Sequence, residues 1–227
     1  MLDFFYYIVY FFDNIGLALC IFSLLKPNNN FITFRKKKIV IIYYCAYFSL
    51  SLIGNLYSYL LSIFALPDSN NWIYDNIPII LSIILFFFFN SLTNSKKANR
   101  ITQISFCLLI LYYVANWKLS IDRDPNTEFY LVFTIFSIIN SIAYLIDNLA
   151  HVQTDSIFDK GEFWFISSLL FYSGGCTLFW TFYKEMYSKY PTQFNLVYLW
   201  ITCHNTILFI SCIIFSLAIY LKTRPSH

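Results

Sequence analysis

The chain has 227 residues, of which 59% are hydrophobic and 12% charged, whereas a typical soluble domain carries about 25% charged residues. This balance excludes an ordinary soluble domain and indicates a membrane protein whose first partner is the lipid bilayer. The net charge of +3 is small, and the basic residues stand beside apolar segments. We therefore expect these residues to set membrane topology, and we expect no nucleic-acid partner.

Seven apolar segments are long enough to cross a bilayer as helices, which takes roughly 20 residues for a hydrocarbon core about 30 Å thick. In chain order they cover approximately residues 4–25, 39–66, 77–93, 101–117, 129–150, 163–183 and 194–221. The connections between them are short and polar, and no separate soluble domain is visible. The sequence thus predicts an all-α membrane protein in which residues 1–227 form a single bundle of seven transmembrane helices.

The distribution of Lys and Arg predicts the orientation of this bundle. The first, third and fifth connections and the C-terminal tail hold eleven basic residues, and the other connections hold four. Because cytoplasmic loops carry the basic excess, we expect the N-terminus outside and the C-terminus in the cytoplasm of a multi-pass inner-membrane protein. Trp72, Trp117 and Trp180 near the outer ends and Trp164 near an inner end are typical of an aromatic belt.

Several common kinds of site are missing from the sequence. The six cysteines all fall within apolar segments without a CxxC pair, so we expect free, buried thiols rather than disulfides. HExxH, GxSxG, Walker A and GxGxxG motifs are absent, and no Lys or Arg lies inside a predicted span. We therefore predict no catalytic residue, cofactor or metal site, and the last absence argues against a retinal pigment or a voltage sensor.

Polar and small residues step by three or four along several predicted spans, which places each set on one helical face. Because lipid-facing positions should be apolar, we expect these faces to point into the bundle. The sets are Tyr6, Asp13, Gly16, Cys20 and Ser23 in the first span; Tyr47, Ser51, Gly54, Asn55, Ser58 and Ser62 in the second; Thr134, Ser137, Asn140, Ser141, Tyr144, Asp147, Asn148 and His151 in the fifth; and His204, Asn205, Cys212 and Ser216 in the last.

Two ionisable residues lie deep in the predicted spans. Asp13 and His204 are each about ten residues from the outer end of their span, hence roughly 15 Å deep. A charge at the bilayer centre costs about 2.5–3.5 kcal/mol, so Asp13 should be neutral or paired, with His204 as the partner if the first and last helices touch. The candidate polar layer or ligand site comprises Asp13, Asn14, Asn55, Asn140, Ser173, His204 and Asn205. Plain hydrogen bonding between helices, worth about 0.6 kcal/mol per bond, is the alternative role.

Two further features are candidates for a role in the bundle. Gly174 and Gly175 lie at mid-membrane in the sixth span and predict either close helix packing or a hinge. Asp147, Asn148 and His151 form a candidate cluster at the cytoplasmic end of the fifth span. The spacing of Asp147 and His151 permits an ion pair or half of a metal site, without the further ligands that a complete site requires.

Three stretches carry a resemblance to a known group: "NNWIYDNIP", "EFWFISSLLFYSGGCTLFW" and "HNTILFISCIIFSLAIY". The chain resembles small seven-helix integral membrane proteins of the Bacteroidetes, which are often encoded beside sensor histidine kinases and response regulators. The resemblance implies a membrane input or accessory module for signalling, with a histidine kinase as partner. Members often carry an acidic residue after the "NNxWxY"-like stretch, where this chain has the apolar "IPIILSII".

Three functions remain open at this point. The leading hypothesis is a non-enzymatic sensor or accessory subunit that acts through a separate membrane signalling protein. A small transporter or channel would use the same polar layer, although no inverted repeat is visible. An intramembrane enzyme acting on lipid would use Asp147, His151 and His204 as acid and base groups, without an evident nucleophile.

Overall fold

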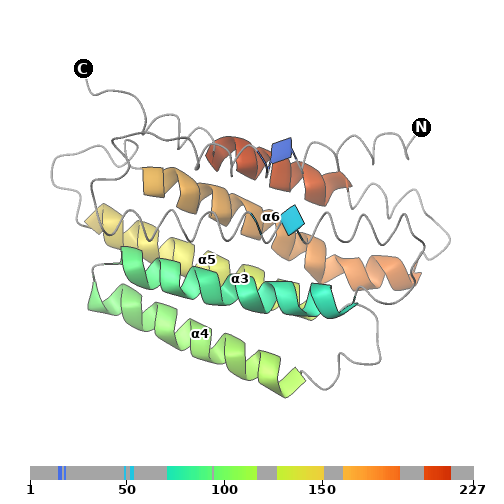
Figure 1. Cartoon of the computed structure of the whole chain (residues 1–227), viewed down its shortest axis with the longest axis horizontal. Helices are drawn as coiled ribbons and strands as arrows, with labels where there is room; N and C mark the ends of the chain where they lie inside the picture. Colours follow the sequence, from blue (N-terminus) through green and yellow to red (C-terminus); the bar gives the residue numbers. More distant parts are fainter. Residues whose placement is uncertain are drawn as a thin grey trace.

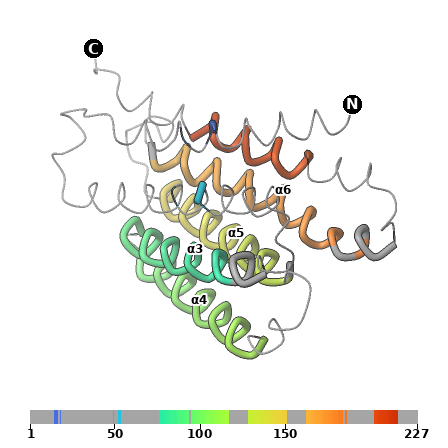
Figure 2. Tube along the Cα trace, turned by 45° about the vertical axis from the view of Figure 1, so that its right-hand side comes forward, coloured from blue at the N-terminus to red at the C-terminus, as the bar shows by residue number. Residues whose placement is uncertain are grey.

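The computed structural model describes residues 15–16, 18, 49, 52–53, 71–93, 95–116, 127–150, 161–189 and 202–215. All secondary-structure elements within these ranges are helices, and five are continuous: α3 (Asn71–Leu92), α4 (Lys96–Asn116), α5 (Thr127–Ala150), α6 (Gly161–Lys189) and the C-terminal helix (Thr202–Phe215). Their axes run roughly along one long direction of the molecule (Figures 1 and 2). The all-helical class is confirmed, whereas most of the first two predicted spans lies outside the described residues.

Three of these helices are long and apolar enough to cross a membrane. The apolar stretches are Lys96–Asn116, Glu128–Ala150 and Glu162–Tyr183, and shorter apolar helices cover Asn76–Leu92 and Thr202–Phe215. A helix of about 20 residues matches a hydrocarbon core of about 30 Å. The lengths and compositions therefore indicate a membrane protein.

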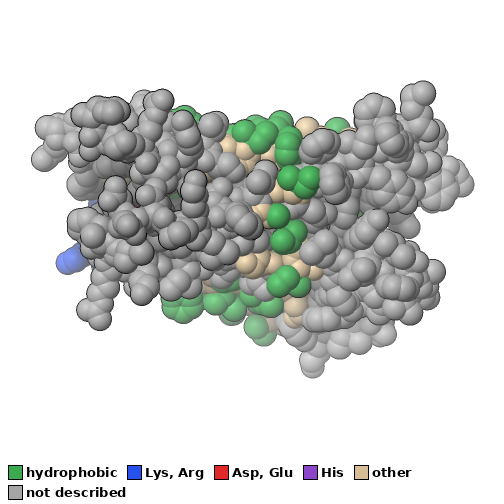
Figure 3. Space-filling model, turned by 45° about the horizontal axis from the view of Figure 1, so that its top comes forward, with side chains coloured by type: hydrophobic (Ala, Val, Ile, Leu, Met, Phe, Trp, Pro, Cys, Tyr) green, Lys and Arg blue, Asp and Glu red, His purple; other side chains and the backbone are tan. Residues whose placement is uncertain are grey.

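The distribution of side chains points to the same surroundings. Large apolar side chains face outward, among them Leu108, Leu111 and Val114 of α4, whose exposed fractions reach 62–69%. Polar side chains are instead buried, including Ser82, Thr102, Thr134, Ser137, Asn140, Ser141, Ser168, Ser173, Asn205 and Ser211. Most of the described side chains visible in Figure 3 are hydrophobic. An apolar outside and a partly polar inside are typical of a protein in lipid. Apolar side chains gain little by leaving the lipid, whereas polar side chains find hydrogen-bond partners only inside the protein.

Aromatic side chains connect the helices through the core. Phe88 of α3 meets Phe165 of α6 edge to face at 5.1 Å between ring centroids, and Phe165 meets Phe215 of the C-terminal helix at 5.2 Å. Phe86 of α3 stacks on Phe106 of α4 at 4.1 Å. Such geometries are favourable because the positive edge of one ring meets the negative face of another, or because the rings stack with an offset. The ring contacts thus link α4, α3, α6 and the C-terminal helix.

Several helices extend past the predicted spans into segments that the sequence assigned to connections. Helix α3 begins at Asn71, seven residues before the buried Pro78, and α6 continues to Lys189. Pro78 removes a backbone N–H inside α3, and the hydroxyl of Ser82 donates to the Pro78 carbonyl at 2.6 Å. The predicted boundaries differ because hydrophobicity marks the depth of the hydrocarbon, whereas backbone hydrogen bonding decides where a helix ends.

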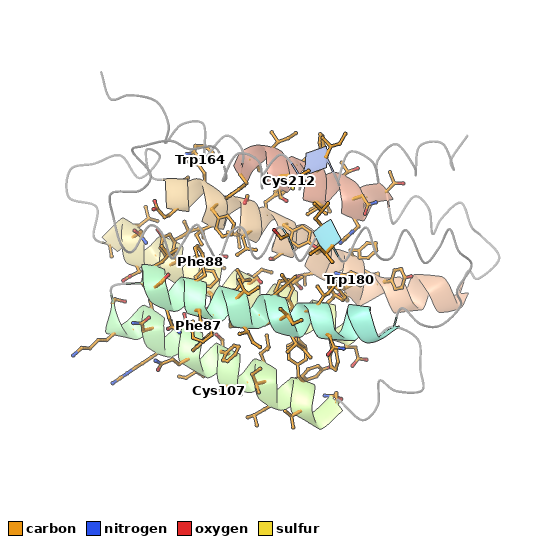
Figure 4. All side chains as sticks on the ribbon, in the orientation of Figure 1. Phe87, Phe88, Cys107, Trp164, Trp180 and Cys212 are labelled. Carbon is orange, nitrogen blue, oxygen red and sulfur yellow. The ribbon has the colours of Figure 1, made fainter. Side chains whose placement is uncertain are left out.

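The cysteines correct one expectation from the sequence. Cys176 and Cys212 are buried thiols outside any disulfide, as predicted, but Cys107 and Cys203, also outside any disulfide, are exposed. Cys107 lies on α4, at the edge of the bundle in Figure 4. A small, weakly polar thiol is compatible with a lipid-facing surface, so an apolar sequence context did not imply burial in the protein.

Candidate functional site

The candidate site is built where the C-terminal helix packs against α6. Phe165 lies against Phe215, Gly175 against Ile207, and Phe179 against His204, so residue numbers fall on one helix as they rise on the other. The two helices are therefore antiparallel. This register brings the polar start of the C-terminal helix to the aromatic second half of α6.

Three rings of α6 surround the imidazole of His204. The ring centroids of Phe179, Trp180 and Tyr172 lie 4.6, 5.6 and 6.1 Å from that of His204. Trp180 also contacts Tyr130 of α5, whose ring stacks on it at 4.6 Å with 21° between the planes. We call His204, Asn205, Tyr172, Phe179 and Trp180 the His204 cluster.

Two buried nitrogens of the His204 cluster have no hydrogen-bond partner among the described residues, namely His204 Nε2 and Trp180 Nε1. His204 Nδ1 lies 3.2 Å from Asn205 Oδ1. An amide oxygen only accepts, so Nδ1 carries the hydrogen in this pair, and Nε2 of the neutral imidazole is an acceptor. The indole Nε1–H only donates. The cluster therefore offers one acceptor and one donor in surroundings where leaving them unsatisfied costs about 1–3 kcal/mol each.

Close packing beside the His204 cluster depends on one glycine. A Cβ placed on Gly175 would lie 2.8 Å from Cδ1 and 2.9 Å from Cγ2 of Ile207. A Cβ on Gly174 would meet no atom within 4 Å. Gly175 is therefore the point of close approach between α6 and the C-terminal helix, one turn from His204, and Gly174 is not.

The first predicted span also reaches the C-terminal helix. Gly16 is helical and buried, and a Cβ on it would lie 3.2 Å from Cys212 Cβ and 3.4 Å from Phe209 Cδ2. The condition set for an Asp13–His204 pair, contact between the first and last helices, is thus met at Gly16. Asp13 and Asn14 themselves lie outside the described residues, as does Asn55.

Asn140 belongs to a different contact. Its Nδ2 donates to Ser105 Oγ of α4 at 3.1 Å and to the Phe136 carbonyl at 2.8 Å, and its buried Oδ1 has no partner among the described residues. The side chain is only 1% exposed. Asn140 therefore ties α5 to α4, on a part of α5 that is separate from the His204 cluster.

The register of the helices places Asn140 and His204 at different heights. Thr177 Oγ1 donates to Thr134 Oγ1 at 3.0 Å, and Tyr130 stacks on Trp180, so α5 and α6 are antiparallel. Because Thr134 lies against Thr177, Asn140 is level with Phe171 of α6. Because Ile207 lies against Gly175, His204 is level with Leu178 of α6. At about 1.5 Å per residue, the two side chains are therefore about 10 Å apart along the helix axes.

The other described candidate residues lie on α5 and α6. Ser173 is fully buried on α6, and its Oγ has no partner among the described residues. Asn148 Nδ2 donates to the Tyr144 carbonyl of its own helix at 3.0 Å, and Asp147 is half-buried near the end of α5. His151 lies outside the described residues. Within the described ranges, no three His, Cys, Asp or Glu side chains gather closely enough to hold a metal ion.

Sequence reasoning missed the aromatic half of the His204 cluster. Trp180 was assigned to an aromatic belt, but its indole nitrogen is buried, whereas a belt residue keeps that nitrogen at the polar interface. A signal was present, since Tyr172, Gly175, Phe179 and Tyr183 step by three or four along α6 and share one face. That face is the one on which the C-terminal helix packs.

In comparisons with known proteins, no family model, no curated protein and no solved structure matched this chain.

Proposed function

We propose that the protein is a multi-pass sensor or accessory subunit of the inner membrane, built from seven helices and acting through a separate signalling protein such as a histidine kinase. Its input site is the His204 cluster. The observation that carries this proposal is the pair of buried nitrogens, His204 Nε2 and Trp180 Nε1, that lack hydrogen-bond partners among the described residues. A small ligand with a hydroxyl group would satisfy both, because its O–H donates to Nε2 and its oxygen accepts from Nε1–H, whereas a carbonyl oxygen would satisfy Nε1 alone.

The packing beside the His204 cluster couples ligand binding to the position of the C-terminal helix. Ile207, which fits against Gly175, is three residues from His204 on the same helix. A side chain packed this closely cannot be compressed, so a group entering beside His204 displaces the C-terminal helix along or away from α6. A ligand shifts the equilibrium between the packed and the displaced positions of the C-terminal helix only by as much as its affinities for the two positions differ. The contacts of a partner protein with either helix would change with this displacement.

The proposal is tested by complementing a strain that lacks the gene and measuring its transcriptional response. His204→Phe keeps an aromatic ring inside the cluster and removes both imidazole nitrogens. Thr206→Val is the matched control, because Thr206 is exposed on the same helix and its hydroxyl donates only to the Thr202 carbonyl, at 2.7 Å. We expect the control to restore the response and His204→Phe to fail at equal membrane abundance.

A second measurement separates sensing from transport. Cross-linking in native membranes followed by purification of the full chain should recover a signalling protein. Proteoliposomes loaded with a pH-sensitive dye report proton flux through the same protein. Full complementation by His204→Phe would refute the input site, and a proton flux abolished by His204→Phe without any cross-linked signalling protein would favour the transporter instead.

A further inference from the structure

Helix α4 has one face turned to the bundle and one turned away from it. Its buried residues are Ala98, Thr102, Leu109 and Tyr113, and its neighbours among the described helices are α3 and α5. On the opposite face, Ile104, Leu108 and Leu111 are 61–64% exposed. Steps of four and three place these three side chains in one continuous apolar stripe along the helix.

The same face begins with three cations. Lys96, Lys97 and Arg100 are exposed in the first turns of α4, and Arg100 is four residues before Ile104, on the line of the stripe. The first turn contains no acidic residue. Cations at this end of a helix face the positive pole of the helix dipole, so the local field is strongly positive.

The start of the helix is fixed by local hydrogen bonds. The Ala98 N–H donates to Ser95 Oγ at 3.1 Å, and the Asn99 N–H donates to the Ser95 carbonyl at 3.1 Å. The hydroxyl of Thr93, just before α4, donates to Asn99 Oδ1. The cations therefore extend from an ordered backbone, and the charged group and the apolar stripe keep a constant spacing.

That spacing matches the two parts of a phospholipid. From Arg100 to Leu111 the helix rises about 16 Å, which is about half of a hydrocarbon core of about 30 Å and hence one leaflet. We propose that this face of α4 binds an anionic phospholipid, whose phosphate lies among Lys96, Lys97 and Arg100 and whose acyl chain lies along Ile104, Leu108 and Leu111. The site is independent of the His204 cluster and of the function proposed for it.

The experiment uses Cys107, which is exposed on α4 (Figure 4) and is the residue before Leu108 of the stripe. The full chain, with its other cysteines replaced by alanine, carries a fluorophore on Cys107 and is placed in bilayers containing phospholipid with brominated acyl chains, which quench nearby fluorophores. Brominated phosphatidylglycerol and brominated phosphatidylcholine are compared at equal mole fractions. We expect phosphatidylglycerol to quench at a mole fraction at least tenfold lower, with a preference that weakens at high salt.

The matched variants remove three charges each. In K96Q/K97Q/R100Q the preference for phosphatidylglycerol should fall towards one, at roughly fivefold for each cation lost. The control K36Q/K37Q/K38Q changes the net charge equally in the first predicted connection, which lies outside the described residues, and here the preference should remain. Equal unfolding temperatures of the two triple variants show that the loss is local.

Three outcomes would overturn the proposal. The first is equal quenching by the two lipids in the unsubstituted protein, and the second is an equal loss of preference in both triple variants. The third is rapid disulfide cross-linking of two chains through Cys107 in the membrane, because it would show that a second copy covers this face.

Discussion

The contact between Gly175 and Ile207 supports a quantitative prediction about stability. In Gly175→Ala the new Cβ would lie 2.8 Å from Cδ1, 2.9 Å from Cγ2 and 3.3 Å from Cγ1 of Ile207. Rotation about χ2 can move Cδ1 away, but Cγ1 and Cγ2 move only with χ1, for which a helical isoleucine has one strongly preferred rotamer, so the helices must separate. Overpacking of this kind costs about 1–3 kcal/mol, and the better helix propensity of alanine returns up to about 1 kcal/mol. We expect Gly175→Ala to lower the free energy of unfolding by about 1–2 kcal/mol.

Two further variants isolate the cause. In Gly174→Ala the new methyl meets no atom within 4 Å, so we expect no loss of stability and a gain of up to about 1 kcal/mol. Ile207→Ala removes all three of the atoms that approach Gly175. The double variant Gly175→Ala/Ile207→Ala should therefore be more stable than the sum of the single effects predicts, by about 1 kcal/mol or more.

The assay is reversible unfolding of the purified full chain in bicelles, followed by the fluorescence of its tryptophans. Two results would refute the reasoning. If Gly174→Ala costs as much as Gly175→Ala, the pair acts as a hinge that needs glycine for its backbone. If the double variant shows simple additivity, Ile207 is not the group that Gly175 accommodates.

Three other substitutions give measurable expectations in the same assay. Asn140→Leu should cost about 0.6–1.7 kcal/mol, because Ser105 Oγ loses its donor 3.1 Å away, and adding Ser105→Ala should cost little more; full additivity would show that the bond is not formed. Thr177→Val keeps the shape and removes the 3.0 Å bond to Thr134 together with the 2.7 Å bond to the Ser173 carbonyl of its own helix; we expect a loss of about 0.6 kcal/mol, and a loss above about 2 kcal/mol would contradict a single interhelical bond. His204→Phe removes the unpartnered Nε2 and also the Nδ1 hydrogen bond to the buried Asn205 Oδ1 at 3.2 Å; the gain and the loss oppose each other, so we expect the free energy of unfolding to change by less than about 1 kcal/mol, and a loss above about 2 kcal/mol would show that the imidazole is structural.

The faces of individual helices could be predicted from the sequence. Thr134, Ser137, Asn140, Ser141 and Tyr144 were assigned to an inward face of the fifth span, and all five are buried in α5. This worked because the polar residues recur with the helical period and lipid excludes them from the outer face. Asn205 and Cys212 of the last span are buried for the same reason.

Contacts between helices could not be predicted in the same way. The register of α6 against the C-terminal helix depends on how Ile207 fits at Gly175, a property of shape that the hydrophobic pattern does not encode. Without that register, Trp180 and Phe179 could not be placed beside His204. Depth counted along one span placed Asn140 and His204 at a similar level, whereas the antiparallel contacts separate these two side chains by about 10 Å.

The antiparallel contact of α6 with the C-terminal helix also bears on how the protein is synthesised. Chains emerge from the ribosome N-terminal end first, so α6 is made before the helix that carries His204 and Asn205. Phe179 and Trp180 are then already in the membrane when this polar pair arrives. The order of synthesis thus provides an aromatic surface for the imidazole before His204 is made, so that the side chain need not face lipid alone. Insertion of the last helix is in this sense templated by α6.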